Sequence, residues 1–333
     1  MPRQMWRPAP FKPFRSAGGA VRPIALAAVL SLAAAGASAQ TYGVATMPPG
    51  TLNHTTGSAI AKVLKEKGGM NVLVQPTAGE STLIPMVGRA EAELGIANIA
   101  AVSGVTRGTG AGQQPDLRLV GSLHALRAAF FVRKDADLKT IADLKGKRVT
   151  TGYSAMRTVD TIVQAMLATA GLAIGDVKPV PVPNVVRGAD DFMSGNADTF
   201  MFGFGAPKVR EVDATVGGVR ALEISAAGMA ASRKIFPYGY LSEVSPGPVY
   251  IGVPQKMKVY SYDNMLFTNA KVKDDLVYKM VATMDKHGAD MAAVQPVLRG
   301  FSAAGLYKQY DIPYHPGALK YFKEKGLKAQ ALQ

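Results

Sequence analysis

The sequence contains no cysteine among its 333 residues, and this excludes disulfides, thiolate catalysis and cysteine-based zinc or iron–sulfur sites. Histidine is scarce as well, since only four are present and no two stand at the spacing of metal ligands. Charged residues make up 19% of the chain and hydrophobic residues 48%, which is enough to bury a full core. We therefore expect two domains or one large α/β unit, with neither a metal site nor a cofactor.

Long apolar runs are also lacking, with one exception near the N-terminus. The run IALAAVLSLAAAGASA (24–39) follows a basic segment without acidic residues and ends in Ala37-Ser38-Ala39, a small-x-small cleavage pattern. Residues 1–39 are therefore interpreted as a secretory signal peptide, cleaved after about Ala39. A retained anchor helix and an Arg-rich transit peptide are the alternatives, but the run is short and alanine-rich for a membrane span.

Basic residues outnumber acidic ones by 38 to 24, a formal charge of +14 at pH 7. Cleavage of residues 1–39 would leave 33 basic and 24 acidic residues, a charge of +9. The basic residues are scattered and are not interleaved with aromatic ones, which argues against nucleic-acid binding. A solvated basic surface that attracts small anions is the simpler interpretation.

Short β-like runs alternate with amphipathic helical runs after residue 40, which predicts an α/β architecture with mostly parallel sheets. The expected strands are YGVATM (42–47), NVLVQPTAG (71–79), AELGIAN (92–98), RVTTG (148–152), KPVPVP (178–183) and ADTFMFGFG (197–205). The expected helices are 56–67, one from about Ser81, 159–170, one around 276–284 and one opened by Pro316 and closed by Gly326. The pattern restarts at DLKGKRVTTG (143–152), so two α/β lobes are predicted.

Three loops that lead from a strand into a helix are rich in small polar residues: MPPGTLNHTTG (47–57), PTAGES (76–81) and TGYSAMRT (151–158). In open α/β sheets, ligands bind at this edge. The helix N-termini there present unpaired N–H groups and the positive end of the helix dipole. A single such loop can equally be a plain helix cap, but three of them favour a binding cleft.

The side chains that we expect to contact a ligand come from these loops and from the end of ADTFMFGFG. They are Thr46, Thr51, Asn53, His54, Glu80, Ser81, Ser154, Arg157, Thr158, Phe204 and Gly205. The hydroxyl groups could donate hydrogen bonds, and Arg157 could fix an anion. A solvated Arg157 and a His54 that only caps its helix are the alternatives.

Catalytic motifs are incomplete, so no catalytic residue is predicted and the protein is not expected to be an enzyme. The segment GYSAM (152–156) resembles a nucleophile elbow but carries Met156 in place of the final glycine. The segment GTGAG (108–112) lacks the flanking strand and helix of a dinucleotide fingerprint.

Three further segments carry a family resemblance: IPYHPGALKYFKEKG (312–326), DLKGKRVTTG (143–152) and LVYKM (276–280). In their order along residues 41–326 they resemble the TAXI-type solute receptors of TRAP transporters. The resemblance implies a type II periplasmic binding-protein fold, with two lobes, a hinge and a central ligand cleft. Lobe I would comprise residues 41–132 plus 262–333, and lobe II residues 133–261.

The same resemblance implies a periplasmic receptor that captures a small organic anion, either a carboxylate or an amino-acid-like compound. Closure of the lobes would bury the solute, and membrane permease subunits would be the partner. The three loops depart from the family's usual pattern, since the first has neither the paired glycines nor the paired tyrosines, which predicts a different solute. An exported ligand sensor of the same fold and an exported α/β enzyme are the alternatives.

Overall fold

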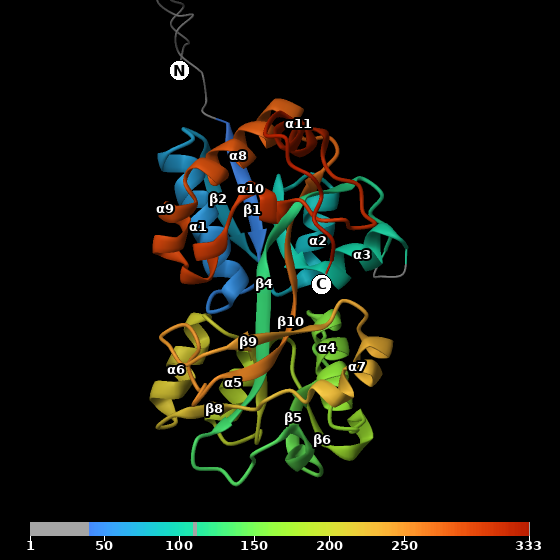
Figure 1. The fold of residues 1–333 in the computed structure, drawn as a ribbon, viewed down its shortest axis with the longest axis vertical. Coiled ribbons are helices and arrows are strands. Elements are labelled where there is room, and N and C mark those ends of the chain that lie inside the picture. Colours follow the sequence, from blue (N-terminus) through green and yellow to red (C-terminus); the bar gives the residue numbers. More distant parts are fainter. Residues whose placement is uncertain (1–39, 109–111, 333) are drawn as a thin grey trace, which may run out of the picture. The chain divides into compact units, whose positions relative to one another are not determined.

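The computed structural model describes residues 40–108 and 112–332 (Figure 1). The predicted signal peptide of residues 1–39 and part of the GTGAG segment lie outside the described residues. Residues 40–333 form one compact unit.

The strands and helices alternate along this unit, as the sequence predicts. The strands are β1 (Thr41–Thr46), β2 (Asn71–Pro76), β3 (Leu94–Asn98), β4 (Leu117–Arg133), β5 (Arg148–Thr151), β6 (Lys178–Pro181), β7 (Phe200–Gly203), β8 (Val219–Ala221), β9 (Tyr240–Val244) and β10 (Met257–Asn269). The helices are α1 (Leu52–Glu66), α2 (Glu80–Gly88), α3 (Ile99–Thr106), α4 (Arg157–Ala168), α5 (Val185–Met193), α6 (Pro207–Thr215), α7 (Met229–Ile235), α8 (Asp274–Lys286), α9 (Gly288–Val294), α10 (Ala303–Leu306) and α11 (Pro316–Glu324). Short 3-10 helices lie at Ile141–Leu144, Ile174–Asp176, Ala226–Gly228 and Pro296–Gly300.

The strands form one eight-stranded sheet and one two-stranded sheet. The large sheet has the order β2-β1-β3-β10-β4-β7, with β8 paired to β4 and β9 paired to β10, and β5 pairs with β6 separately. The α/β class is confirmed, but the expectation of mostly parallel sheets is wrong. Strand β1 runs parallel to β2 and β3, and β5 runs parallel to β6, whereas β10 and β4 are antiparallel to each other and to their other neighbours.

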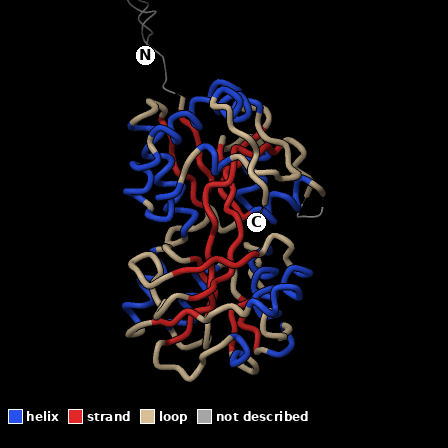
Figure 2. Tube along the Cα trace, in the orientation of Figure 1, coloured by secondary structure: helices blue, strands red, loops and turns tan. Residues whose placement is uncertain are grey.

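Strands β4 and β10 run side by side through the length of the unit (Figures 1 and 2). Elements β1–β3, α1–α3 and α8–α11 surround one end of this pair and are called the upper half here, from their place in Figure 1. Elements β5–β9 and α4–α7 surround the other end and are called the lower half. The predicted lobe boundaries at 132/133 and 261/262 stay a prediction, because residues 40–333 form a single compact unit.

Buried aromatic side chains form much of the core of the lower half. Phe131 of β4 is fully buried and stacks on Phe200, with ring centroids 5.4 Å apart. Phe204 meets the same ring edge to face at 5.2 Å. These contacts attach β7 to the crossing strand β4. The aromatic core therefore fixes the position of β7 in the lower half.

The first helix begins earlier than the sequence predicts. The apolar face suggested a start near residue 56, but α1 starts at Leu52, because the Thr51 hydroxyl caps it by accepting a hydrogen bond from the His54 N–H at 3.2 Å. Asn53 and His54 therefore lie in the first turn of a helix instead of in a loop. This fixes the direction of both side chains.

Candidate functional site

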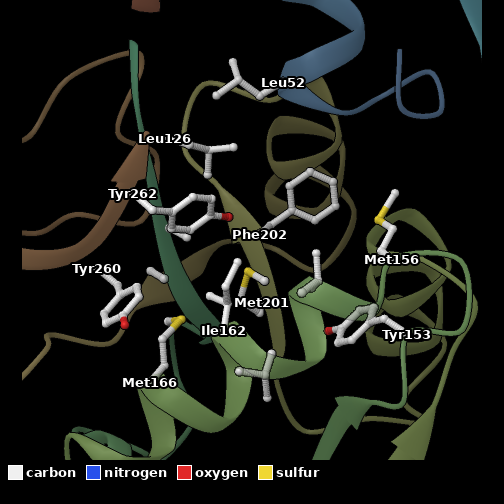
Figure 3. Close-up of a cluster of buried hydrophobic side chains, with 14 of the residues drawn as sticks. Leu52, Leu126, Tyr153, Met156, Ile162, Met166, Met201, Phe202, Tyr260 and Tyr262 are labelled. Carbon is white, nitrogen blue, oxygen red and sulfur yellow. The ribbon is translucent and has the colours of Figure 1, made fainter. Parts of the chain in front are cut away.

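A cavity of about 60 Å³ lies where the two halves meet the crossing strands. Figure 3 shows some of the side chains that line it, among them Leu52, Met156 and Phe202. Its lining residues are Met47, Thr51, Leu52, Asn53, Glu80, Asn98, Leu126, Met156, Val159, Val185, Met201, Phe202, Gly203 and Tyr262. The upper half supplies the polar side chains apart from Tyr262 of β10, and the lower half supplies an apolar wall. Such a lining, mostly apolar with a few polar groups, is typical of sites for small organic molecules.

Helix N-termini from both halves converge on the cavity. Thr51 caps α1, Glu80 is the first residue of α2, and Asn98 caps α3 by accepting a hydrogen bond from the Ala101 N–H at 2.9 Å. Met156 occupies the N-cap position of α4. Helices α1, α2 and α3 follow strands of the large sheet, as the sequence reasoning expects, whereas α4 follows β5 of the two-stranded sheet.

The Glu80 carboxylate joins the two halves. It is 4% exposed, and its Oε1 accepts hydrogen bonds from the backbone N–H of Thr158, at 2.8 Å, and from the Thr158 hydroxyl. Its Oε2 accepts from Asn98 Nδ2 at 3.2 Å, and the same Asn98 amide also donates to the Thr158 hydroxyl at 2.7 Å. Burial raises the pKa of Glu80, and the two bonds from Thr158 act against that shift. Glu80 of α2 thus caps the N-terminus of α4 in the opposite half.

A second series of hydrogen bonds runs from the cavity wall into the crossing strands. The Asn53 amide donates to the Ile96 carbonyl at 3.3 Å and accepts from Asn264 Nδ2 at 3.2 Å. Asn264 Nδ2 also faces His124 Nε2 at 3.3 Å, while His124 Nδ1 lies 3.0 Å from the Ala125 carbonyl. Because a carbonyl can only accept, Nδ1 carries the proton and Nε2 accepts from Asn264. A neutral His124 therefore holds Asn264, which in turn holds Asn53.

The imidazole of His124 is expected to make stability fall in mild acid. Burial, with a contribution from the nearby Arg127 charge, lowers the pKa of His124 to about 4. Between pH 6.5 and 4 the unfolded chain takes up a proton that the folded chain refuses, so the free energy of unfolding drops as the pH falls, by about 3 kcal/mol over this window. His124→Gln should show a shallower decline over the same pH range in denaturant titrations. Equal slopes for both proteins would contradict this assignment.

The remaining predicted site residues lie outside the cavity lining. Thr46 and His54 are bonded to each other through Oγ1 and Nδ1 at 3.2 Å, and burial lowers the pKa of His54. Thr158 lies against Glu80, as described above. The other five divide into exposed residues (Ser81, Ser154 and Arg157), a ring in the aromatic core (Phe204) and the wall of a separate cavity of about 180 Å³ (Gly205).

The structure thus brings Thr51, Asn53, Glu80 and Thr158 together from loops up to 107 residues apart. Sequence reasoning missed Asn98 and the apolar wall. Asn98 directly follows the AELGIAN strand and so carried the same signal as the other loops. The apolar wall carried none, because side chains such as Met201 and Phe202 look like ordinary core residues in a sequence.

Two kinds of feature are absent from the part of the chain that the structure describes. Residues 40–108 and 112–332 hold no group of acidic or histidine side chains arranged to bind a metal ion. No helix within these ranges has the length and apolar character needed to cross a membrane.

Several solved structures have a similar fold, and those whose descriptions state a role are binding or transport proteins. The chain resembles the alkanesulfonate-binding protein SsuA from Xanthomonas axonopodis pv. citri, with 14% identity, a TM-score of 0.50 and coverage of 85% of this chain and 83% of that one. A structure described as a periplasmic transporter gives 13% identity and a TM-score of 0.55, over 78% of this chain and 87% of that one. A protein from Bordetella bronchiseptica RB50 gives 14% identity and 0.50, over 86% and 98%.

Identities this low establish the fold alone, and the fold is the α/β arrangement of periplasmic solute-binding proteins. The family follows from the sequence of the described unit. Residues 44–326 match the NMT1-like family over most of the chain, so the protein belongs to the NMT1-like family.

Proposed function

We propose that this protein is a periplasmic solute-binding subunit, which captures a small organic molecule between its two halves and delivers it to a membrane permease. The observation that carries the proposal is the cavity between the halves, lined by helix N-termini from both of them. The similarity in fold to periplasmic binding proteins supports the same conclusion.

Capture by closure is supported by noncovalent contacts between the halves, in addition to the crossing strands that connect them. Besides the Glu80–Thr158 bonds, the Ser81 N–H donates to the Ala155 carbonyl at 3.3 Å. The Tyr238 hydroxyl reaches Ser103 Oγ at 2.6 Å. We propose that these contacts break when lobe I (41–132 plus 262–333) and lobe II (133–261) open about the crossing strands.

The finer proposal is a TAXI-type receptor of a TRAP transporter that takes a small organic anion, either a carboxylate or an amino-acid-like compound. Arg157 supports an anionic group on the solute, because it directly follows Met156 of the cavity lining. It is the first residue of α4, is exposed and has no side-chain hydrogen bond or ion pair among the described residues, so it is available to a carboxylate.

Native mass spectrometry of the protein purified from a periplasmic extract tests the proposal. We expect one small organic molecule to leave the protein on denaturation and to raise its melting temperature when added back. Absence of any bound or re-binding solute, together with turnover of a substrate, would favour an enzyme instead.

Gly79→Ala is expected to hold the halves apart. A Cβ at Gly79 would lie 2.2 Å from the Ala155 carbonyl oxygen, a backbone atom of the other half that cannot move by itself. Affinity for the solute found by mass spectrometry should fall at least about tenfold, or about 1.4 kcal/mol, by calorimetry. Gly175→Ala is the matched control, because a Cβ there meets nothing within 4 Å. Unchanged affinity in both variants would contradict closure through this contact.

A further inference from the structure

The buried Glu80 carboxylate has only neutral partners. Its three hydrogen-bond donors are the Thr158 backbone, the Thr158 hydroxyl and the Asn98 amide. A carboxylate offers about four acceptor positions, so one remains, and it lies on Oε2, which accepts a single bond among the described residues. Because Glu80 lines the cavity, this position is open to a molecule inside it.

No positively charged side chain of the described residues compensates Glu80. The cavity lining contains no lysine, arginine or histidine, and Glu80 takes part in none of the ion pairs among the described residues. A buried carboxylate without a cation is unfavourable, and proteins usually pair such a charge. Only a cation beside it would compensate the ionised carboxylate, so this side of the cavity favours a cation over an anion.

The Tyr262 hydroxyl is a second unused polar group in the same cavity. The residue is 4% exposed, and its hydroxyl has no hydrogen-bond partner among the described residues. Figure 3 shows this hydroxyl directed toward Phe202 across the cluster. Burial, together with the Glu80 charge, raises the pKa of Tyr262, so the hydroxyl stays neutral and can accept a hydrogen bond.

The opposite wall is apolar. Met156, Val159, Val185, Met201 and Phe202 line it, and none of them can form a strong hydrogen bond. The ring faces of Phe202 and Tyr262 add an attraction for a cation close to them. The cavity thus has two unlike sides. One side accepts hydrogen bonds through Glu80 and Tyr262, and the other is apolar.

Resting on the proposed solute-binding function, and in place of the simple carboxylate considered there, we infer that the solute is an amphipathic organic amine, whose ammonium group donates hydrogen bonds to Glu80 and Tyr262 inside the cavity. Its apolar body lies against the wall formed by Met156, Val159 and Phe202. Where the solute also carries a carboxylate, Arg157 is available to that group, because it is next in sequence to the lining residue Met156 and has no ion pair among the described residues. Glu80 is then the residue that selects amines over simple carboxylates.

Three probes with the same branched body test this inference: isopentylamine, isopentanol and isovalerate. Calorimetry with the wild-type protein should show isopentylamine binding at least tenfold more tightly than isovalerate. Glu80→Gln should lose at least tenfold in affinity for the amine and reduce the difference between amine and acid. Tyr262→Phe should lower the affinity for the amine several-fold and leave the affinity for isovalerate unchanged.

Glu66→Gln is the matched control, because Glu66 is half-exposed and pairs with Lys62 on the surface of α1. It should bind all three probes like the wild type. Equal wild-type affinity for amine and acid, no binding of the amine, or an unchanged affinity in Glu80→Gln would overturn the inference. If Glu80→Gln does not fold, the wild-type comparison and Tyr262→Phe decide the question. A co-purified solute without an amine would overturn it too, while leaving the proposed function intact.

Discussion

Replacing Lys308 by methionine is expected to lower the free energy of unfolding by about 3–5 kcal/mol, because it leaves a buried charge without its partner. Lys308 Nζ lies 2.6 Å from Asp263 Oδ2, and the two side chains are only 15% and 7% exposed. The hydroxyls of Tyr240, at 2.7 Å, and of Tyr310 also donate to this carboxylate. Methionine keeps most of the lysine's length but removes the ammonium. The Asp263 charge is then stabilised only by the two neutral tyrosine hydroxyls.

The pH dependence of the same variant gives a second measurement. Although burial acts to raise it, the Lys308 charge and the hydrogen bonds lower the pKa of Asp263. An acid with a lowered pKa stabilises the fold above its unfolded pKa of about 4, and this contribution is lost as the pH falls through the folded value. The difference in the free energy of unfolding between the wild type and Lys308→Met should therefore become smaller in acid.

Two controls separate the buried charge from the loss of side-chain packing. Asp263→Asn combined with Lys308→Met should destabilise less than the sum of the single changes, since neither charge is then left alone. Lys62→Met removes an exposed pair with Glu66 and should cost less than about 1 kcal/mol. Denaturant titrations in which Lys62→Met and Lys308→Met lose the same stability would contradict this argument.

Phe131→Ala is expected to lower the free energy of unfolding by about 3–5 kcal/mol, the cost of a large cavity in a packed core. Phe131 is fully buried, and its ring contacts Phe200 and Phe204, so truncation removes contacts on two sides. Leu73→Ala is the control, because Leu73 is 51% exposed and should cost about 0.5 kcal/mol or less. Guanidinium titrations of the two variants measure the difference. A similar loss for both would mean that the aromatic cluster contributes little.

Local sequence signals predicted the alternating elements and the loops that build the cavity. Thr51, Asn53 and Glu80 follow strands that end at one edge, and this placement depends only on strand direction. The long strands β4 and β10 were not predicted, because buried polar residues such as Ser122, Asp263 and Asn264 interrupt the apolar pattern by which a strand is recognised. Their antiparallel pairing is what makes the large sheet mixed.

The pairing between the halves had no local signal. Glu80 and Thr158 are 78 residues apart, and nothing in either segment specifies that a carboxylate from one helix caps another. The same holds for the apolar wall, since Phe202 lines the cavity while Phe204, two residues later, packs in the aromatic core. Only the tertiary fold separates these two rings. The contact of Phe204 with a ligand stays a prediction.

The pairing of β10 with β4 shifts register at Asn264/Met265 and again at Leu266/Phe267. Such irregularities interrupt the ladder and bend the strand, so the crossing strands are most easily flexed there. Asn264 lies at the first shift and also holds Asn53 in the cavity wall. A receptor that flexes at this point would couple the rates of solute entry and escape to one side chain. Substitutions at Asn264 would then change how long a solute stays bound even when every atom that touches the solute is kept.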